Sequence, residues 1–232
     1  MCNEIFWQPL MTSLPASGPT PRYQVVDYGD ANSLTGMAAT VLAAAPPQFA
    51  LAGHSMGGRV ALEVMRLAGS RVQKLILMDT GYLPCFGGEA GATERAGRMA
   101  LIDLARRAGV GAMCSQWVKG MVHPDRLNDE ALINAIMLMF TRKTAEGFAR
   151  QQNALLTRRD FSAVLAELTL PVLLMCGRHD SWANVAQHAA MQALAPHAQL
   201  SVIEDAGHMV LMEQPEATTQ VIQTFLQSSL EL

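Results

Sequence analysis

The stretch FALAGHSMGGRVALEVM, residues 49–65, places a serine between two glycines where an apolar run gives way to a helical pattern. A chain that turns this sharply from a strand into a helix passes through strained backbone angles, and the side chain at the apex stands above the edge of the sheet. Gly53 and Gly57, two residues to either side, remove Cβ atoms that would clash in the turn. The stretch predicts a nucleophile elbow with Ser55 at its apex; a polar turn residue without chemistry is the alternative.

The helix that follows this turn aims its free N–H groups, and the positive end of its dipole, at the serine. A carbonyl oxygen becomes negative when a nucleophile attacks its carbon, and such a helix end stabilises that charge. We therefore predict that the backbone N–H of Met56 is one donor of an oxyanion hole.

The alternation of apolar runs with helical patterns continues along the chain. Short apolar runs lie at residues 23–28, 49–53, 74–79, 171–177 and 198–205, and most are followed by a stretch with helical spacing. Continuous apolar runs of this length fit strands that are buried on both faces, as in a parallel sheet. The pattern predicts an α/β fold in which a mostly parallel central sheet is flanked by helices.

Residues 81–168 interrupt this alternation, because they hold helical patterns and no convincing strand. We predict a helical insertion, or cap, over residues 81–168, and a core domain formed by residues 1–80 and 169–232. Asn128, Thr144 and Asp160 are the predicted N-caps of the last three cap helices, since short polar side chains satisfy the free N–H groups of a helix start.

A serine hydroxyl is a weak nucleophile at neutral pH, so it needs a base, and the base needs an acid to orient it. Asp180 follows the apolar run 171–177, and His208 follows the run 198–205. Loops after parallel strands meet at one edge of the sheet, which brings both residues towards Ser55. Asp79, at the end of the run 74–79, is the rival acid. The remaining histidines, His54 among them, are predicted to be structural or solvated.

Composition argues against several classes of function. The 232 residues are 50% hydrophobic and 16% charged, with a net charge of −3, so neither a nucleic-acid nor a membrane surface is expected. The four cysteines lack metal-ligand spacing and are typical of reduced thiols in the cytoplasm. The start MCNEIFWQPL has no signal-peptide pattern, and no apolar run reaches the ~20 residues of a membrane span. We expect a cytoplasmic protein without a metal site.

Three segments together resemble the α/β-hydrolase superfamily: GHSMGGRVALE at 53–63, GRHD at 177–180 and DAGHMVLMEQPE at 205–216. They are similar to small bacterial carboxylic-ester hydrolases, including the type that cleaves pimeloyl methyl esters, and to the cofactor-free haloperoxidase-like branch. The resemblance implies the α/β-hydrolase fold with a helical cap over the active site. It also implies Ser55 as nucleophile, His208 as base, Asp180 as the orienting acid and the Met56 backbone as half of the oxyanion hole.

The start of the chain departs from this family. Members carry a central strand, between those matching 23–28 and 49–53, whose following loop supplies the second oxyanion donor. MCNEIFWQPL resembles the sequence just after that loop. Three explanations are open: the native start lies upstream, the two flanking strands pair directly, or another chain donates a strand. We favour the first, and expect that restoring the upstream segment raises stability and activity. Met1 or Cys2 is otherwise expected near the missing donor.

The predicted reaction transfers an acyl group from an ester to water through an acyl-enzyme on Ser55, with no cofactor. The apolar cap favours a small to medium apolar ester, and Trp117 and Met121 are the predicted pocket residues. A carbon–carbon bond hydrolase that acts on a diketone with the same triad is one alternative. A non-catalytic ligand-binding protein on the same fold is another. The natural substrate and the oligomeric state stay open.

Overall fold

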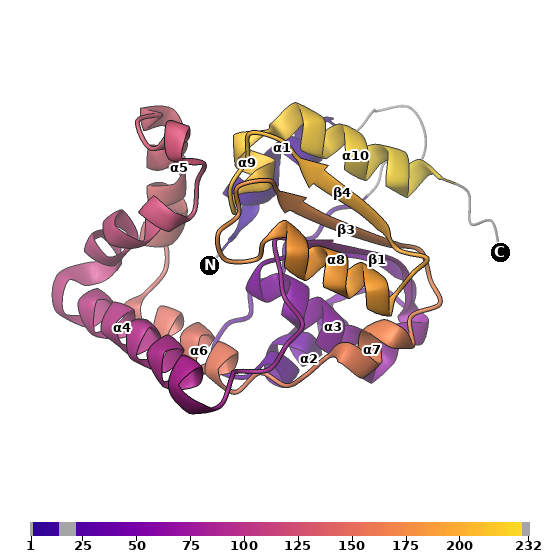
Figure 1. Cartoon of the computed structure of the whole chain (residues 1–232), viewed down its shortest axis with the longest axis horizontal. Helices are drawn as coiled ribbons and strands as arrows, with labels where there is room; N and C mark the ends of the chain where they lie inside the picture. The colour runs from indigo at the N-terminus through magenta and orange to yellow at the C-terminus, as the bar shows by residue number, and fades with distance from the viewer. Residues whose placement is uncertain (1, 14–21, 229–232) are drawn as a thin grey trace.

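The central sheet has four parallel strands in the order β1-β2-β3-β4 (Figure 1). The computed structural model describes residues 2–13 and 22–228. Within them the strands are β1 (Phe49–His54), β2 (Val72–Met78), β3 (Val172–Gly177) and β4 (Gln199–Ile203). The prediction of a parallel sheet is confirmed for these four apolar runs. Because all four strands run in the same direction, their carboxyl ends share one edge of the sheet.

The predicted strand at residues 23–28 is wrong. These residues form a loop without ladder hydrogen bonds. A strand needs a neighbour that accepts and donates those bonds, and in the described part of the chain β1 pairs only with β2 and ends the sheet. The direct pairing of the 23–28 run with β1, one of the three explanations above, therefore does not occur.

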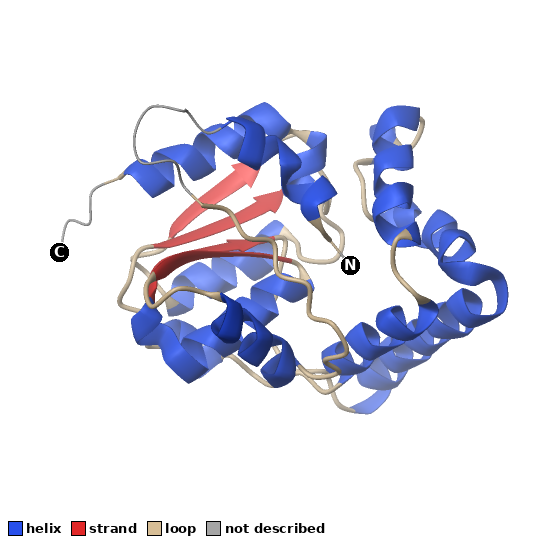
Figure 2. Ribbon diagram, turned by 180° about the vertical axis from the view of Figure 1, so that it is seen from behind, coloured by secondary structure: helices blue, strands red, loops and turns tan. Residues whose placement is uncertain are grey.

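Helices cover both faces of the sheet (Figures 1 and 2). One face carries α1 (Glu4–Ser13), α9 (Val210–Glu213) and α10 (Pro215–Gln227). The other carries α2 (Leu34–Ala44), α3 (Met56–Ala68), α7 (Ser162–Ala166) and α8 (Val185–Leu194), and the 3₁₀ turn η1 (Gly69–Arg71) joins α3 to β2.

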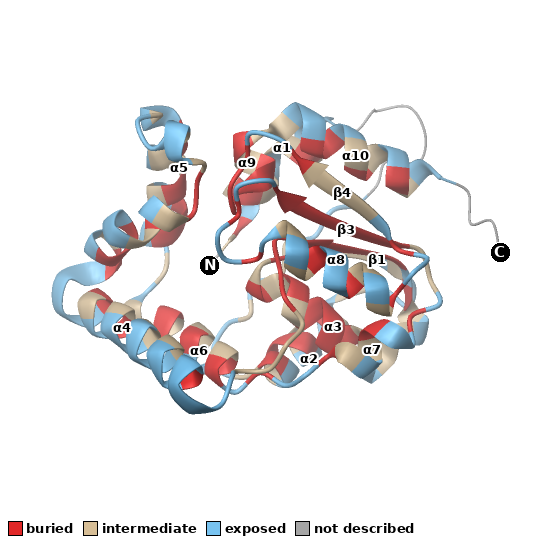
Figure 3. Ribbon diagram, in the orientation of Figure 1, coloured by how far each residue is buried: buried red, intermediate tan, exposed pale blue. Residues whose placement is uncertain are grey.

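The two central strands, β2 and β3, are buried because side chains on both of their faces enter a core (Figure 3). Successive residues of a strand point to opposite faces. Ile76 and Met78 of β2 accordingly pack in the core beneath α1 and α10, whereas Leu75 and Leu77 pack in the core beneath α3 and α8. This double burial explains why the strand runs are continuously apolar rather than alternating.

Residues between β2 and β3 form a helical layer beyond the carboxyl ends of the strands (Figure 1). It contains α4 (Gly88–Trp117), α5 (Glu130–Thr141) and α6 (Ala145–Leu156), with the 3₁₀ turns η2 (Val118–Gly120) and η3 (Pro124–Arg126). Gly109, at φ 85°, kinks α4. Among the helices of the described residues, none combines the length and the apolar character needed to cross a membrane.

Of the three predicted helix starts between β2 and β3, which belong to α5, α6 and α7, one is right. Thr144 caps α6, since its side chain accepts from Gly147 N. Asp129 rather than Asn128 caps α5, because its carboxylate accepts from Leu132 N. Phe161 is the cap residue of α7, although the Asp160 carboxylate accepts a 2.8 Å hydrogen bond from Ser162 N and so still satisfies that helix start.

Candidate active site

Ser55 stands at a strained turn between β1 and α3. Its backbone has φ 55° and ψ −119°, a conformation that costs energy in any residue with a side chain. Two hydrogen bonds hold it there: Ser55 N donates to Met78 O at 2.8 Å, and Thr80 Oγ1 donates to Ser55 O at 2.6 Å. The turn thus depends on the neighbouring strand β2 as well as on its own sequence.

The two glycines that flank Ser55 differ in importance. A Cβ on Gly53 would stand 2.3 Å from Gly57 O and 2.7 Å from Gly58 N, both of them backbone atoms that cannot move aside. A Cβ on Gly57 would meet only Tyr28 Oη at 3.5 Å, an ordinary contact. The explanation of Gly57 by crowding is therefore wrong, and the crowded glycine on that side is Gly58, whose Cβ would stand 2.6 Å from Thr80.

Gly53→Ala is expected to destabilise the protein by at least about 3 kcal/mol, because the added methyl group displaces the backbone of the turn. Gly57→Ala is the matched control and is expected to cost less than about 1 kcal/mol. Urea unfolding followed by circular dichroism measures both. Equal losses in the two variants would contradict this description of the turn.

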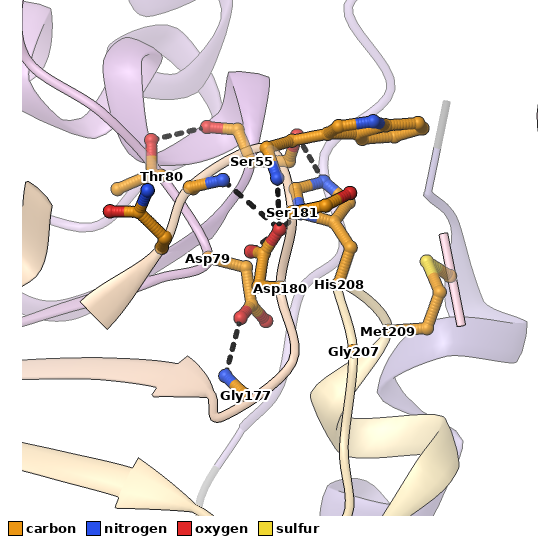
Figure 4. A network of polar contacts seen from close by, with 12 residues as sticks. Ser55, Asp79, Thr80, Gly177, Asp180, Ser181, Gly207, His208 and Met209 are labelled. Atoms are coloured by element: carbon orange, nitrogen blue, oxygen red, sulfur yellow. Dashed lines mark hydrogen bonds and ion pairs between the residues drawn. The ribbon is translucent and has the colours of Figure 1, made fainter. Parts of the chain in front are cut away.

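Ser55, His208 and Asp180 form one chain of hydrogen bonds (Figure 4). Ser55 Oγ lies 2.9 Å from His208 Nε2, and His208 Nδ1 lies 2.8 Å from Asp180 Oδ2. Since the Asp180 carboxylate can only accept, Nδ1 carries the proton and Nε2 is left with a lone pair that faces the serine hydroxyl. The three predicted triad residues are therefore brought together in an arrangement suited to removing the serine proton.

The Asp180 carboxylate is held in its ionised form. Burial by itself raises the pKa of this carboxyl, but attraction to His208 and hydrogen bonds from His208, Ala183 N and Trp182 N outweigh burial and hold the pKa below its usual value. The two backbone bonds go to Oδ1, at 2.8 Å from Trp182 N and 3.0 Å from Ala183 N. Oδ2 is thereby left to orient His208.

The backbone of His208 is fixed on both sides. His208 N donates to Met121 O at 2.7 Å, and His54 Nε2 donates to His208 O at 2.7 Å. Burial and the nearby His208 lower the pKa of His54 to about 3, so His54 is neutral and carries its proton on Nε2. The prediction that His54 is structural agrees with this position, in which its ring packs 4.2 Å from that of Phe6.

Asp79, the rival acid, lies beside Asp180 and makes no hydrogen bond to His208 in the described structure (Figure 4). Its Oδ1 accepts from Gly177 N at 3.0 Å, and its Oδ2 is buried, 3.5 Å from His54 Nε2. Burial and the charge of Asp180 raise the pKa of this carboxyl well above its ordinary value. Two ionised carboxylates so close together would repel, and protonation of Asp79 removes that repulsion.

Asp79→Asn is expected to gain stability relative to wild type as the pH rises. The folded protein keeps the Asp79 proton, whereas the unfolded chain loses it above the ordinary pKa of 3.8. Fewer protons are then bound by the unfolded chain, so wild-type stability falls with rising pH, by at most about 1.4 kcal/mol per pH unit. Asparagine keeps the same shape without the proton. Urea unfolding at mildly acidic and at mildly alkaline pH tests this; a pH-independent difference would contradict it.

Glu213 is a site residue that sequence reasoning missed. It is buried at the end of α9, and its Oε1 accepts from Gly207 N at 2.9 Å and from Met209 N at 3.1 Å. Its Oε2 accepts from His123 N at 2.6 Å. Burial raises the pKa of Glu213, while these three hydrogen bonds oppose the increase. The Glu213 carboxylate thus links Gly207 and Met209, the two neighbours of His208, to His123 in the segment between β2 and β3.

Ser55 and His208 open into a cavity of about 1550 Å³. The predicted pocket residues Trp117 and Met121 line it, and so does Trp182, which sequence reasoning missed. The rings of Trp182 and Trp117 stack with their centroids 5.4 Å apart, and the Trp182 ring lies 4.8 Å from that of His208. The cavity also follows the outer edge of β1, where residues 49–53 line it.

The predicted oxyanion donor, the backbone N–H of Met56, lies at the start of α3. Met56 is the first residue of that helix, so its N–H is one of the four without an acceptor inside the helix. Cys2 lines the same cavity, with its Sγ 3.3 Å from His54 Nδ1, while Met1 lies outside the described residues. In the described part of the chain, no three His, Cys, Asp or Glu side chains are grouped so as to hold a metal ion.

Comparison with known sequences gives a family and several relatives. The model of the alpha/beta hydrolase family matches residues 8–221. A pimeloyl-[acyl-carrier protein] methyl ester esterase of Aliivibrio salmonicida is 25% identical, over 97% of this chain and 88% of its own length. The acetyltransferase component of the acetoin cleaving system of Pseudomonas putida is 33% identical over 76% of this chain. The chain spans 45% of that longer relative.

Solved structures of the same fold include esterases. A thermophilic esterase from Thermogutta terrifontis, in a malate-bound form, superposes with a TM-score of 0.81 at 25% identity, over 97% of this chain and 85% of its own. The esterase EaEST from Exiguobacterium antarcticum also gives a TM-score of 0.81, at 20% identity, over 97% of this chain and 88% of its own. The predicted fold class is confirmed.

Proposed function

The chain belongs to the alpha/beta hydrolase family, and within that family of hydrolases and esterases we propose that it is a serine esterase with Ser55 as nucleophile. The observation that carries the proposal is the continuous chain of hydrogen bonds from Ser55 Oγ through His208 to Asp180. A serine without a base is a poor nucleophile. Here His208 Nε2 contacts the Ser55 hydroxyl, and the imidazole proton is on Nδ1, facing Asp180.

The proposed reaction has two symmetrical halves. Ser55 Oγ attacks the ester carbonyl carbon while His208 Nε2 takes the hydroxyl proton, and the carbonyl oxygen becomes an oxyanion beside Met56 N–H. The tetrahedral intermediate collapses, the alcohol leaves with the proton from His208, and an acyl-enzyme remains. Water then attacks the acyl-enzyme with His208 again as base, and the acid is released. Asp180 stabilises the imidazolium that forms in each half.

The cavity supports a carboxylic ester with an apolar body as substrate. Trp117, Trp182 and Met121 offer apolar surface next to Ser55 and His208. Burial of apolar surface supplies most of the affinity in such a pocket, while a few polar groups fix orientation. The stacked pair of tryptophans places this surface at the reacting serine, where it can position an acyl chain.

Initial rates of p-nitrophenyl acetate, butyrate and octanoate hydrolysis test the proposal. We expect turnover that depends on Ser55, with longer acyl chains favoured through a lower KM. Ser55→Ala, prepared in the same way, is the control for contaminating esterase. Rates in wild type no higher than in Ser55→Ala for all three esters would contradict the proposed function and favour a binding role for the fold.

A further inference from the structure

Three arginines and a single carboxylate gather where the helical layer joins the core. Glu94 of α4 accepts from Arg158 through both of its oxygens, at 2.6 and 2.8 Å, and from Arg98 at 2.8 and 2.9 Å. Arg98 Nη1 also donates to Gln152 Oε1 at 2.6 Å. The acceptor capacity of Glu94 is thus taken up by two guanidinium groups.

The third arginine, Arg59, has no carboxylate partner among the described residues. It lies on α3, four residues after Ser55 and therefore about 6 Å further along the helix axis. Its Nη1 donates to Leu83 O at 2.7 Å, an oxygen that also accepts from Arg158 Nε at 3.2 Å. Burial, together with the charges of Arg158 and Arg98, lowers the pKa of Arg59 to about 9. With three guanidinium groups and one carboxylate, the cluster holds uncompensated positive charge.

The side-chain amide of Gln187 lies beside Arg59 on the wall of the cavity. Arg59 Nη2 and Gln187 Nε2 lie 2.7 and 2.0 Å from the point where a Cβ on Gly81 would stand. Because Gly81 has no side chain, the two nitrogens occupy the space that a Cβ would take and so lie next to each other. Arg59, Gly81 and Gln187 line the same cavity as Ser55 and His208. The two donors are therefore neighbours on the wall of the cavity that Ser55 and His208 also line.

We propose that Arg59 and Gln187 bind a carboxylate group at the far end of the ester substrate. The substrate would then be an ester with an apolar body and an anionic end, such as the monoester of a dicarboxylic acid. This inference rests on the proposed esterase function and goes beyond it by naming the substrate class. Guanidinium is the side-chain group best matched to the two oxygens of a carboxylate, and its attraction is strong where water is excluded.

Two esters of matched length test the proposal: monomethyl adipate, which carries a carboxylate, and dimethyl adipate, which does not. We expect wild type to have a kcat/KM at least about tenfold higher for the monoester, the size of effect that a charge-assisted hydrogen bond gives. Arg59→Met is expected to bring the ratio of the two values close to one, mainly through the KM of the monoester. Gln187→Leu is expected to lower the ratio less.

Arg106→Met is the matched control. Arg106 is exposed on α4 and pairs with Glu146, away from the cavity lining, so its loss should leave the ratio unchanged. A wild-type preference for dimethyl adipate, or an unchanged ratio in a folded Arg59→Met, would overturn the proposal. If Arg59→Met does not fold, an unchanged ratio in Gln187→Leu would overturn it.

Binding without turnover separates this proposal from the proposed function. Calorimetry of monomethyl adipate with Ser55→Ala measures the carboxylate contact alone. We expect binding that is weakened at least about tenfold by adding Arg59→Met and kept when Arg106→Met is added instead. Binding that follows this pattern without any ester turnover would contradict only the esterase. Turnover with equal binding in the two double variants would contradict only the carboxylate site.

Discussion

Ser55→Ala and His208→Ala are each expected to lower kcat for ester hydrolysis by about 10⁴- to 10⁶-fold. Among the described residues, Ser55 Oγ and His208 Nε2 hydrogen-bond to each other, at 2.9 Å. Removal of either residue therefore disables the same step. Because Ser55 and His208 act together in one step, the double variant is expected to have about the same kcat as the less active of the two single variants.

Thermal unfolding is the control for these two variants. Alanine at position 55 keeps the backbone bonds to Met78 and Thr80, so the fold is expected to remain. The loss of activity should then appear in kcat at nearly unchanged KM. More than a tenth of wild-type activity in either variant would contradict the assignment of nucleophile and base.

Asp180→Asn is expected to lower kcat by about 10⁴-fold without unfolding the protein. The asparagine oxygen can still accept from Trp182 N and Ala183 N, but its amide then presents a donor to His208 Nδ1. The imidazole responds by moving its proton to Nε2, the nitrogen that must accept the proton of Ser55. His208 can then no longer accept the Ser55 proton, although the positions of the three side chains are unchanged.

Asp79→Asn is the matched control for this variant. Asp79 is also buried at a strand end, yet its pKa is raised well above its ordinary value by burial and by Asp180, and it makes no hydrogen bond to His208 in the described structure. Its replacement is therefore expected to cost less than about tenfold in kcat. The ratio of the two losses identifies the acid of the triad. A larger loss in Asp79→Asn than in Asp180→Asn would transfer that role to Asp79.

Features with a local physical cause could be predicted from the sequence. The two central strands could be predicted because burial on both faces makes their runs continuously apolar. Ser55, Asp180 and His208 come together because each follows a strand of one parallel sheet. The crowding at Gly53 follows from the sharp turn after β1.

Features that depend on distant neighbours could not be predicted. Residues 23–28 have a strand-like composition, but a strand also needs a partner, and composition does not reveal that no strand of the described sheet pairs with this segment. Glu213 looks like an ordinary helix residue until the loop around His208 folds over it. Arg59, Gly81 and Gln187 are far apart in the chain and meet only through the packing of α3, β2 and α8.

Intact mass after exposure to a fluorophosphonate tests the central claim, an activated Ser55, most directly. The reagent reacts with a serine only where a base and an oxyanion site are assembled around it. We predict a single adduct in the wild-type protein, none in Ser55→Ala, and strongly slowed labelling in His208→Ala. The absence of an adduct in wild type, or the same adduct in Ser55→Ala, would contradict the claim.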